Sequence, residues 1–562
     1  MTFSDWGGRL VPFPEDRADH YRASGAWSSD PTGQRLHEIA IRFPDRSAVI
    51  TAEREISFIE LDRRTDQIAA GLIRLGLQRL DPVIFQLTNR LETVLAWYGC
   101  VKAGLIPVAT LAAHRMHEIG NISRKVGAVA HIVEASLPTF DLVGFAREHA
   151  ADHPTIRHIL TVAGASDGAE PRLEELGLDI PVTSARAIVE QTEAQTDPLD
   201  VAAFQLSGGT TGVPKVIPRI HAEYWNNALL YARRLGWDEH SRVAHLIPII
   251  HNAGITCGLH AAHSVGACLI LATADASSAF ELMARARATE VLIGHGHYQA
   301  VLSPDFDKAR ASLSRVVLSG AKVPLELFER VDDGAGHWAG QLFGMSEGLF
   351  TVTPPRAPTQ ARLRTVGTPV AADDEIRILE PGTENELGDG EVGELCCRGP
   401  YTIPGYFDAP DHNREAFTSD GFYRTGDLAA ITIIDGERYL SIEGRIKDLI
   451  NRGGEKINAE ELELLLLAHP GVAHAAVVAM PDPRLGERTC AYLVATDGEP
   501  LPLSDIQDHL MQLGVAKFKW PERLEWASSL PHTNVNKIDK KRLRAEIAAK
   551  VAAEAEMSHT VV

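Results

Sequence analysis

The stretch Ser207-Gly208-Gly209-Thr210-Thr211-Gly212-Val213-Pro214-Lys215 is the part of the sequence around which the rest of the chain is organised. It follows an apolar run, residues 202–206, that is typical of a buried strand. Glycine lets the backbone approach a bulky anion closely, and successive amide N–H groups in such a turn form a concave site for phosphate oxygens. The hydroxyl groups add donors and Lys215 adds a cation. The stretch therefore predicts a loop that binds a polyphosphate.

This loop is not a Walker A loop, because Pro214 separates the last glycine from Lys215 and no Gly-Lys-Ser/Thr sequence follows. The ordinary alternative is a flexible surface loop, which most clusters of glycine, serine and threonine form. The order of the residues and the motifs further along the chain favour the phosphate-binding interpretation.

Length and composition restrict the class of protein. A chain of 562 residues exceeds the size of a single hydrophobic core, so we expect two or more domains. The net charge of −20 argues against non-specific nucleic-acid binding, which needs a positive field. The six cysteines form no metal-binding pattern and fit a reducing compartment. With no signal-like segment and no run of about 18 apolar residues, we expect a cytoplasmic protein that binds neither nucleic acid nor membrane.

Hydrophobic periodicity indicates an α/β fold. A helix begins at Ser57, where Glu60 completes a capping box. Strands alternate with helices up to about residue 320, which predicts parallel, doubly wound sheets. The strands are expected at residues 82–87, 105–108, 130–133, near 159, 243–250, 267–272, 291–293 and 315–319, and one of the helices at about 222–235.

The pattern changes after about residue 370. Short strands at 375–379, 393–398 and 438–442, with a turn at Asp435-Gly436, predict an antiparallel β layer. Beyond residue 445 we expect a compact α+β region, with strands at 475–480 and 490–495, a helix capped by Asn458 and a helix beginning at Ser504 with Gln507 at its capping position. The predicted organisation is a large N-terminal domain of doubly wound sheets plus a β layer, residues 1–445, and a small mobile C-terminal domain, residues 446–562.

Four later motifs each have an ordinary alternative. Phe343-Gly344-Met345-Ser346-Glu347 offers a hydroxyl for phosphate and a carboxylate for Mg²⁺, or is a turn with a solvated glutamate. Tyr423-Arg424-Thr425-Gly426-Asp427 offers a carboxylate for ribose, or is a β-turn. The charged residues 444–456 mark a domain junction or a solvated face. Residues 534–538 place Lys537 in a polar turn, where most lysines are surface residues.

Taken in order, these motifs resemble the ANL superfamily of adenylate-forming enzymes over essentially the whole chain. Within it the sequence is most similar to the stand-alone aryl-acid AMP ligases that activate 2,3-dihydroxybenzoate or salicylate. Four features carry this second likeness: an N-terminal arm with Phe13-Pro14 and residues 21–27, the form Gln205-Leu206-Ser207-Gly208-Gly209-Thr210-Thr211-Gly212, the pair His251-Asn252, and residues 450–457.

The resemblance implies a reaction in two steps. ATP activates an aryl carboxylic acid, salicylate-like or bulkier, to an acyl-AMP with release of pyrophosphate. The acyl group then passes to the phosphopantetheine thiol of a carrier protein. The alternative within this class is an aryl- or acyl-CoA ligase that uses free CoA. Two other classes are a non-catalytic relative that only binds nucleotide and a P-loop kinase or ATPase, which would release ADP. The implied cofactors are ATP and Mg²⁺.

The resemblance also implies roles for individual residues. The loop 207–215 would hold the β- and γ-phosphates, Ser346 the α-phosphate and Glu347 the Mg²⁺. Adenine would lie beside Gly320-Ala321 and Gln341-Leu342-Phe343, and Asp427 and Arg445 would hold the ribose. Lys537 would bridge the substrate carboxylate and the α-phosphate. His251 would gate the site, Lys447 would be the hinge, and Gly453-Gly454 would line the thiol tunnel.

The substrate is expected to contact Asn252, Ala253, Cys257 and Leu342. Amino-acid-activating relatives hold the α-ammonium with an aspartate where this chain has Asn252, so the neutral amide favours an acid without an α-amine. At the positions of Cys257 and Leu342, this sequence is similar to the sequences of the salicylate activators. Ala253 replaces their tyrosine and residues 294–297 lack their usual proline, which predicts a bulkier or differently substituted ring acid. Asn536 stands where relatives have glycine, which predicts slow adenylation if the turn is disturbed.

Overall fold

The computed structural model describes residues 6–164, 169–207, 214–320, 323–334, 336–452, 455–533 and 537–560. The chain forms two compact units. The first contains Met1–Ile376 and Cys397–Tyr423, and the second contains Arg377–Cys396 and Arg424–Val562. The division into functional domains at residue 445 stays a prediction.

A nine-stranded sheet forms one half of the first unit, in the order β15-β14-β13-β12-β11-β9-β10-β1-β2. The pairs from β13 to β1 are parallel, and antiparallel strands lie at both edges. The carboxyl ends of β9, β11, β12 and β13 therefore meet at one edge of the sheet. The strands are β1 (Ser47–Ile50), β2 (Glu55–Ser57), β9 (Arg242–His245), β10 (Cys268–Leu271), β11 (Glu290–Gly294), β12 (Arg315–Ser319), β13 (Trp338–Gly344), β14 (Phe350–Val352) and β15 (Thr368–Pro369).

A six-stranded sheet forms the other half, in the order β6-β5-β3-β4-β7-β8. Its pairs are parallel except for β7 and β8, which are antiparallel neighbours joined by the loop 207–215. The predicted phosphate loop is thus a hairpin connection at the edge of a sheet. The strands are β3 (Pro82–Gln86), β4 (Ile106–Val108), β5 (Ala130–Glu134), β6 (His158–Val162), β7 (Val201–Leu206) and β8 (Val216–Ile220).

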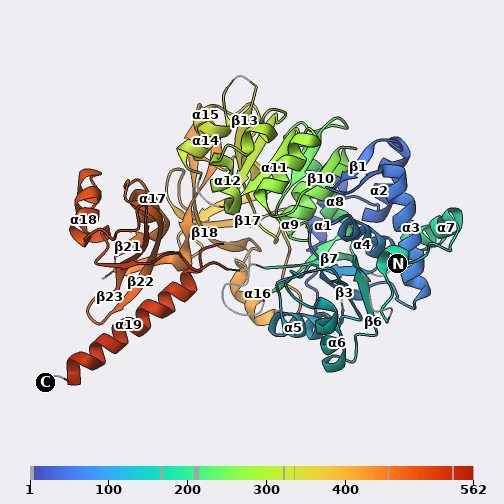
Figure 1. Ribbon diagram of the computed structural model, residues 1–562, viewed down its shortest axis with the longest axis horizontal. Helices are drawn as coiled ribbons and strands as arrows, with labels where there is room; N and C mark the ends of the chain where they lie inside the picture. The colour runs from blue at the N-terminus through green and yellow to red at the C-terminus, as the bar shows by residue number, and fades with distance from the viewer. Residues whose placement is uncertain are drawn as a thin grey trace. The chain divides into compact units, whose positions relative to one another are not determined.

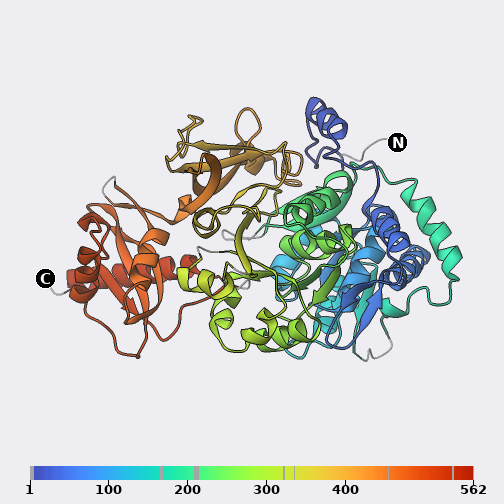
Figure 2. The ribbon, with the colours of Figure 1, turned by 90° about the horizontal axis from the view of Figure 1, so that it is seen from above.

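Helices pack against these two sheets (Figures 1 and 2). The predicted capping box is confirmed at the start of α3, where the Ser57 side chain accepts from the Glu60 N–H and the Glu60 side chain accepts from the Ser57 N–H. The helices are α1 (Glu15–Ala23), α2 (Thr32–Arg42), α3 (Phe58–Arg74), α4 (Leu91–Lys102), α5 (Met116–Val126), α6 (Leu142–Asp152), η1 (Leu173–Glu175), α7 (Val182–Glu193), α8 (His221–Arg234), α9 (Asn252–Gly254), η2 (Ile255–Leu259), α10 (His260–Ser264), α11 (Ala276–Arg285), η3 (His295–His297), α12 (Tyr298–Leu302), α13 (Phe306–Arg310), α14 (Leu325–Val331), α15 (Thr359–Arg364) and α16 (Pro410–Ala416).

The strand predicted over residues 243–250 is wrong in its second half, because β9 ends at His245. Pro248 has no N–H to donate to a neighbouring strand, and its carbonyl instead accepts from the His251 N–H at 3.0 Å. The chain turns here and enters α9 at Asn252. This turn places His251 and Asn252 beyond the strand rather than inside it.

The second unit contains two sheets, ordered β16-β17-β18-β19 and β21-β20-β23-β22, with β24 paired to β23. The predicted hairpin turn is confirmed between β18 and β19, where Asp435 has φ 54° and Gly436 has φ 83°, as a type I′ turn requires. The strands are β16 (Glu375–Leu379), β17 (Gly393–Arg398), β18 (Tyr423–Ile434), β19 (Glu437–Arg445), β20 (Leu449–Arg452), β21 (Glu455–Asn458), β22 (Val472–Asp482), β23 (Gly486–Ala495) and β24 (Arg523–Trp526).

Helices cover the second of these sheets. They are η4 (Ile446–Asp448), α17 (Ala459–Leu467), α18 (Leu503–Gln512), η5 (Lys517–Lys519) and α19 (Lys540–Thr560), the long terminal helix drawn in red in Figure 1. Asn458 caps α17 as predicted, accepting from the N–H groups of Glu460 and Glu461. The predicted cap at Ser504 is wrong: α18 begins one residue earlier, after Pro502, and the Gln507 side chain donates to the Pro521 carbonyl. Of the described helices, none has the length and apolar character needed to cross a bilayer.

Candidate active site

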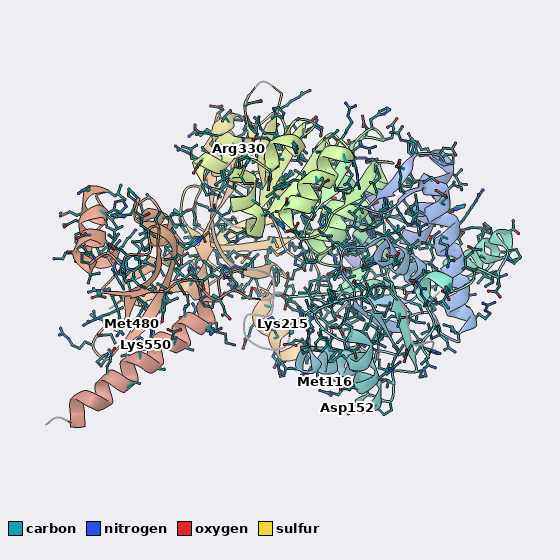
Figure 3. The ribbon with its side chains drawn as sticks, viewed as in Figure 1. Met116, Asp152, Lys215, Arg330, Met480 and Lys550 are labelled. Carbon is teal, nitrogen blue, oxygen red and sulfur yellow. The ribbon has the colours of Figure 1, made fainter. Side chains whose placement is uncertain are left out.

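The two ends of the loop 207–215 are bound to each other. The Ser207 N–H donates to the Lys215 carbonyl at 3.0 Å, and the Lys215 N–H donates to Ser207 Oγ at 2.9 Å. Lys215, labelled in Figure 3, places its ammonium group 5.8 Å from the centre of the Tyr406 ring. The predicted phosphate-binding residues between the two ends, Gly208, Gly209, Thr210, Thr211 and Gly212, lie outside the described residues.

Glu347, the predicted metal ligand, is buried and bound by Tyr406, which in turn contacts Tyr423 of the same unit. The Tyr406 hydroxyl donates to Glu347 Oε1 at 2.6 Å, and the Tyr423 hydroxyl lies 2.8 Å from the Tyr406 hydroxyl. Burial and the Glu347 charge raise the pKa of Tyr406 far above its ordinary value, so Tyr406 stays a hydrogen-bond donor. Sequence reasoning missed Tyr406, because 59 residues separate it from Glu347 and no spacing links the two.

A buried ion pair fixes the turn that carries Ser346. Arg219 on β8 pairs with Glu223 at 2.6 Å, and its Nη1 donates to the Ser346 carbonyl at 2.7 Å. Gly348, with φ 137°, follows in the same turn, and a Cβ atom there would lie 1.6 Å from the Tyr401 carbonyl oxygen. The turn after β13 therefore has little freedom, which suits a segment that must present a hydroxyl and a carboxylate in a fixed geometry.

The predicted adenine-binding residues lie on β13 and just after β12, in the nine-stranded sheet. Gly320 follows β12 with φ 100°, and Gln341, Phe343 and Gly344 lie on β13. The Gln341 amide donates to the Arg362 carbonyl on α15 at 3.0 Å, so its side chain is held by the fold. Ala321 lies outside the described residues.

Asn252 is fully buried, and its carboxamide belongs to a chain of hydrogen bonds. Gln205 Nε2 donates to the Tyr224 hydroxyl at 2.9 Å, and that hydroxyl donates to Asn252 Oδ1 at 2.9 Å. The Thr256 hydroxyl also donates to Oδ1, at 3.4 Å. Asn252 Nδ2 donates to the Met345 carbonyl at 3.4 Å. The acceptor side of this amide is therefore occupied, and its second N–H remains as a donor.

Small and apolar side chains lie near Asn252 in the sequence and, together with Leu342, contribute to the same hydrophobic core. Cys257 is buried in η2, a π-helical turn, and burial raises the pKa of its thiol well above the ordinary value. Leu342 is buried on β13, and the half-buried Ala253 packs against the same core. His251 is exposed at the start of α9, and its Nδ1 accepts from the Ala253 N–H at 3.3 Å. The structure thus brings Asn252, Ala253 and Cys257 onto one short helical segment.

The second unit brings together three predicted site residues. Arg445 Nε lies 2.9 Å from Asp427 Oδ1, across the β18–β19 pair. Although part of Lys537 reaches solvent, burial and then the Arg445 charge lower the pKa of Lys537, while the carboxylates of Asp427 and Glu460 oppose this shift. The predicted ribose ligands and the predicted catalytic lysine are thus electrostatic neighbours. Asn536 lies outside the described residues.

Lys447, the predicted hinge, lies in η4 between β19 and β20. Arg544 of α19 donates to the Lys447 carbonyl at 3.2 Å and pairs with Asp448 at 2.8 Å. These contacts tie the connecting segment to the terminal helix of the same unit. Gly453 and Gly454, predicted to line a thiol tunnel, lie outside the described residues.

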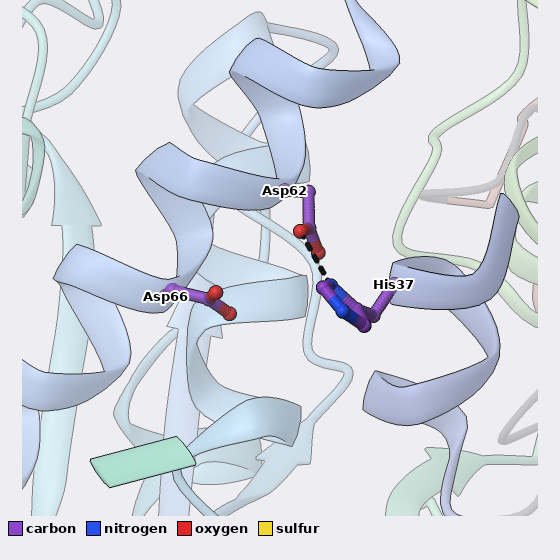
Figure 4. A group of neighbouring side chains, drawn as sticks. All are labelled: His37, Asp62 and Asp66. Atoms are coloured by element: carbon purple, nitrogen blue, oxygen red, sulfur yellow. Dashed lines mark hydrogen bonds and ion pairs between the residues drawn. The ribbon is translucent and has the colours of Figure 1, made fainter. Parts of the chain in front are cut away.

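A second cluster of possible metal ligands lies far from these motifs in the sequence. His37, Asp62 and Asp66 approach one another between α2 and α3 (Figure 4). The buried ammonium group of Lys102 lies 2.6 Å from Asp62 Oδ1 and 2.7 Å from Asp66 Oδ1. Burial alone would raise the pKa of Asp62, but Lys102 and His37 outweigh it and lower the pKa to about 2. A cation of the protein itself occupies this cluster, so we assign it a structural role.

Comparison with known proteins identifies the class. A sequence profile of the AMP-binding enzyme family matches residues 36–407, and a profile of the AMP-binding enzyme C-terminal domain matches residues 461–537. A salicylyl-CoA synthase / salicylate adenylyltransferase from a Streptomyces species is 38% identical over 96% of this chain and 98% of its own. A 2-hydroxy-7-methoxy-5-methyl-1-naphthoate–CoA ligase from Streptomyces carzinostaticus is 36% identical over 95% and 96%.

A solved structure agrees with these sequence matches. The apo structure of MbtA from Mycobacterium smegmatis is 35% identical, with a TM-score of 0.71, over 96% of this chain and 99% of that one. The fold and the matches together define an acid–AMP ligase with the architecture of the ANL superfamily, as the sequence predicted. The chain belongs to the AMP-binding enzyme family, whose adenylate-forming members use ATP.

Proposed function

We propose that this ligase activates an aryl carboxylic acid, salicylate-like or bulkier, to its acyl-AMP and passes the acyl group to the phosphopantetheine thiol of a carrier protein. Two of the similar relatives are named for salicylate and for a substituted naphthoate. The proposal concerns which acid is bound and which thiol receives it. The residues around Asn252 support the choice of acid.

The observation that carries the proposal is the orientation of the Asn252 amide. Its Oδ1 accepts from both Tyr224 and Thr256, so it does not offer a lone pair to a substrate ammonium group. Its remaining N–H suits a substrate acceptor such as a phenolic oxygen next to the carboxylate. An amino acid would bring a buried ammonium group without a carboxylate partner, which is costly. The site therefore favours an acid without an α-amine.

Side-chain volume supports a ring larger than that of salicylate. Ala253 places a single methyl group beside Asn252, and the Cys257 thiol stays neutral because burial raises its pKa. Leu342 supplies an apolar surface on the adjacent strand. Such a lining gains free energy from aromatic area removed from water.

The first unit would hold the triphosphate. Ser207, Lys215 and the glycines between them would bind the β- and γ-phosphates, and the Ser346 hydroxyl would bind the α-phosphate. The fit to Mg²⁺ is good, because that ion takes one or two protein carboxylates and completes its shell with phosphate oxygens and water. Glu347 would supply this carboxylate, and the ion would neutralise charge on the phosphates. The strand backbone at Gln341–Phe343 and Gly320 would flank adenine.

The second unit would supply the remaining groups. Asp427 would accept hydrogen bonds from the ribose hydroxyls, with Arg445 beside it. Lys537 would place its ammonium group between the two anions that must meet, the substrate carboxylate and the α-phosphate. After adenylation, rotation about Lys447 would withdraw Lys537 and bring Gly453 and Gly454 to the thiol path, while His251 moves aside as a gate.

ATP–pyrophosphate exchange over a panel of about 30 aryl, amino and aliphatic acids tests the first step. We expect exchange with aryl acids that carry an ortho hydroxyl, and with bicyclic ring acids at least as well as with salicylate. Exchange confined to aliphatic acids or to amino acids would contradict the proposal.

A second candidate is a CoA ligase, which the names of two relatives favour. The two candidates share the adenylation step and differ only in the thiol. Presenting the acyl-AMP with a holo carrier protein or with free CoA, at equal concentration, separates them. We expect faster acyl transfer to the carrier, and faster transfer to CoA would establish the second candidate.

A further inference from the structure

We propose that Tyr406 is a positioning residue that orients the Glu347 carboxylate for the metal–ATP complex. The inference rests on the proposed metal-binding role of Glu347. Tyr406 lies in the segment 397–423, far from Glu347 in the sequence, and reaches it through its hydroxyl at 2.6 Å. Both side chains belong to the first unit, where Glu347 is 8% and Tyr406 3% exposed.

The direction of the hydrogen bonds follows from the number of protons. Tyr406 carries one hydroxyl hydrogen, and a carboxylate can only accept, so the hydrogen points to Glu347 Oε1. The Tyr423 hydroxyl, 2.8 Å away, then donates to the Tyr406 oxygen. A bond from a phenol to a carboxylate is charge-assisted and strong. This hydrogen bond fixes Glu347 Oε1. Among the residues that the structure describes, no hydrogen-bond partner is found for Oε2. The Oε2 atom can therefore face a cation.

The Tyr406 ring also separates two opposite charges. Lys215 lies over the ring face, with its ammonium group 5.8 Å from the ring centre, while Glu347 lies at the hydroxyl edge. In the described part of the chain no ion pair joins Lys215 to Glu347. A direct pair would neutralise both groups before ATP arrived. Tyr406 thus keeps the lysine available for phosphate and the carboxylate available for the metal ion.

The variant Tyr406→Phe tests this role, because it retains the ring under Lys215 and removes only the hydroxyl. Binding of Mn²⁺ to the full chain, measured by electron paramagnetic resonance with a non-hydrolysable ATP analogue, needs neither turnover nor a carboxylic acid. We expect a weakening of Mn²⁺ binding of about tenfold, the size expected for one hydrogen bond to a charged group. The affinity for the analogue without metal should stay within twofold.

Two further variants complete the experiment. Tyr423→Phe, which removes the outer hydroxyl, should weaken Mn²⁺ binding less than Tyr406→Phe does. Glu347→Gln should weaken it more. If Tyr406→Phe lowers the melting temperature but leaves Mn²⁺ affinity unchanged, its role is structural and the proposal fails. Unchanged Mn²⁺ binding in Glu347→Gln would also overturn it. None of these measurements uses a carboxylic acid, so their results do not depend on whether the proposed acid substrate is correct.

Discussion

The Tyr224 hydroxyl donates a hydrogen bond to Asn252 Oδ1 over 2.9 Å, and Gln205 donates to the same hydroxyl. Tyr224 is buried on α8, and burial raises the pKa of Tyr224 above its ordinary value, so the phenol keeps its proton. A residue of one helix thereby sets which end of the Asn252 amide faces the site. In the proposed site, selection of the acid would therefore depend on Gln205 and Tyr224 as well as on Asn252.

Asn252→Asp should lower kcat/KM for aryl acids by about tenfold or more, because a carboxylate near the substrate carboxylate and phenolic oxygen is repulsive. Tyr224→Phe should give a smaller loss, since it frees the amide to rotate without adding charge. The measurement is pyrophosphate exchange against acid concentration. An Asn252→Asp enzyme with unchanged aryl-acid kinetics would remove Asn252 from the substrate site.

Lys537 should impose an alkaline limit on adenylation. The ordinary pKa of a lysine is 10.5, and burial together with the Arg445 charge lowers the pKa of Lys537 in the folded protein below that value. In the proposed mechanism the ammonium form of Lys537 is the active one, so kcat/KM for adenylation should fall as pH rises through the lowered pKa. The Lys537→Arg enzyme should adenylate more slowly than the natural enzyme. Its kcat/KM should not fall at alkaline pH, because arginine stays charged. Lys537→Ala should slow adenylation by about 10²-fold or more. If the alkaline limit is unchanged in Lys537→Arg, that limit is due to the titration of another group.

Lys102→Met should destabilise the first unit without touching the proposed site. The substitution removes the buried cation that Asp62 and Asp66 share. It leaves them His37 and Arg186 as basic partners, so the loss should approach about 3–5 kcal/mol, the cost of breaking a buried pair. Arg74→Met provides a matched control, because its pair with Asp179 is exposed on both sides and such pairs contribute about 0–1 kcal/mol. Urea unfolding of the two variants gives the comparison, and equal losses would contradict the structural role of Lys102.

Asp374 should make the protein less stable as pH rises. Its carboxyl oxygens are buried, and burial raises the pKa of Asp374 to about 8 despite the opposing effect of a hydrogen bond from the Ala371 backbone. The folded state therefore holds a proton that the unfolded chain loses near its ordinary pKa of 3.8. This contribution is complete below pH 3.8 and declines up to about pH 8.

Replacing Asp374 with asparagine isolates that contribution. Asp374→Asn should be more stable than the natural chain at pH 8 and gain little at pH 4, because an amide has no proton to lose. Urea unfolding at the two pH values tests the difference. A gain that is the same at both values would show that Asp374 does not titrate in this range.

Local rules were sufficient for much of the fold. The capping box at Ser57, the cap at Asn458 and the type I′ turn at Asp435-Gly436 each depend on residues within four positions, so the sequence predicts them directly. The alternation of strands and helices predicts the parallel sheets for the same reason. Two local predictions failed near a proline: β9 ends at His245, three residues before Pro248, and α18 begins directly after Pro502 rather than at Ser504.

The contacts that orient the proposed site were beyond such rules. Tyr406 reaches Glu347 across 59 positions, and Arg219 reaches Ser346 across 127. Tyr224 sets the Asn252 amide from the first turn of α8. None of these residues belongs to the motif that it supports, and a contact between distant segments leaves no spacing to find in one sequence. The motifs supplied the reacting groups, and the tertiary structure supplied the groups that hold them.

The mutual closure of Ser207 and Lys215 has a consequence for protein engineering. Because the backbone enters and leaves the segment at two points bound to each other, the seven intervening positions form an exchangeable cassette. Variants confined to that cassette can be screened for altered nucleotide preference while the strand pairing on either side is retained.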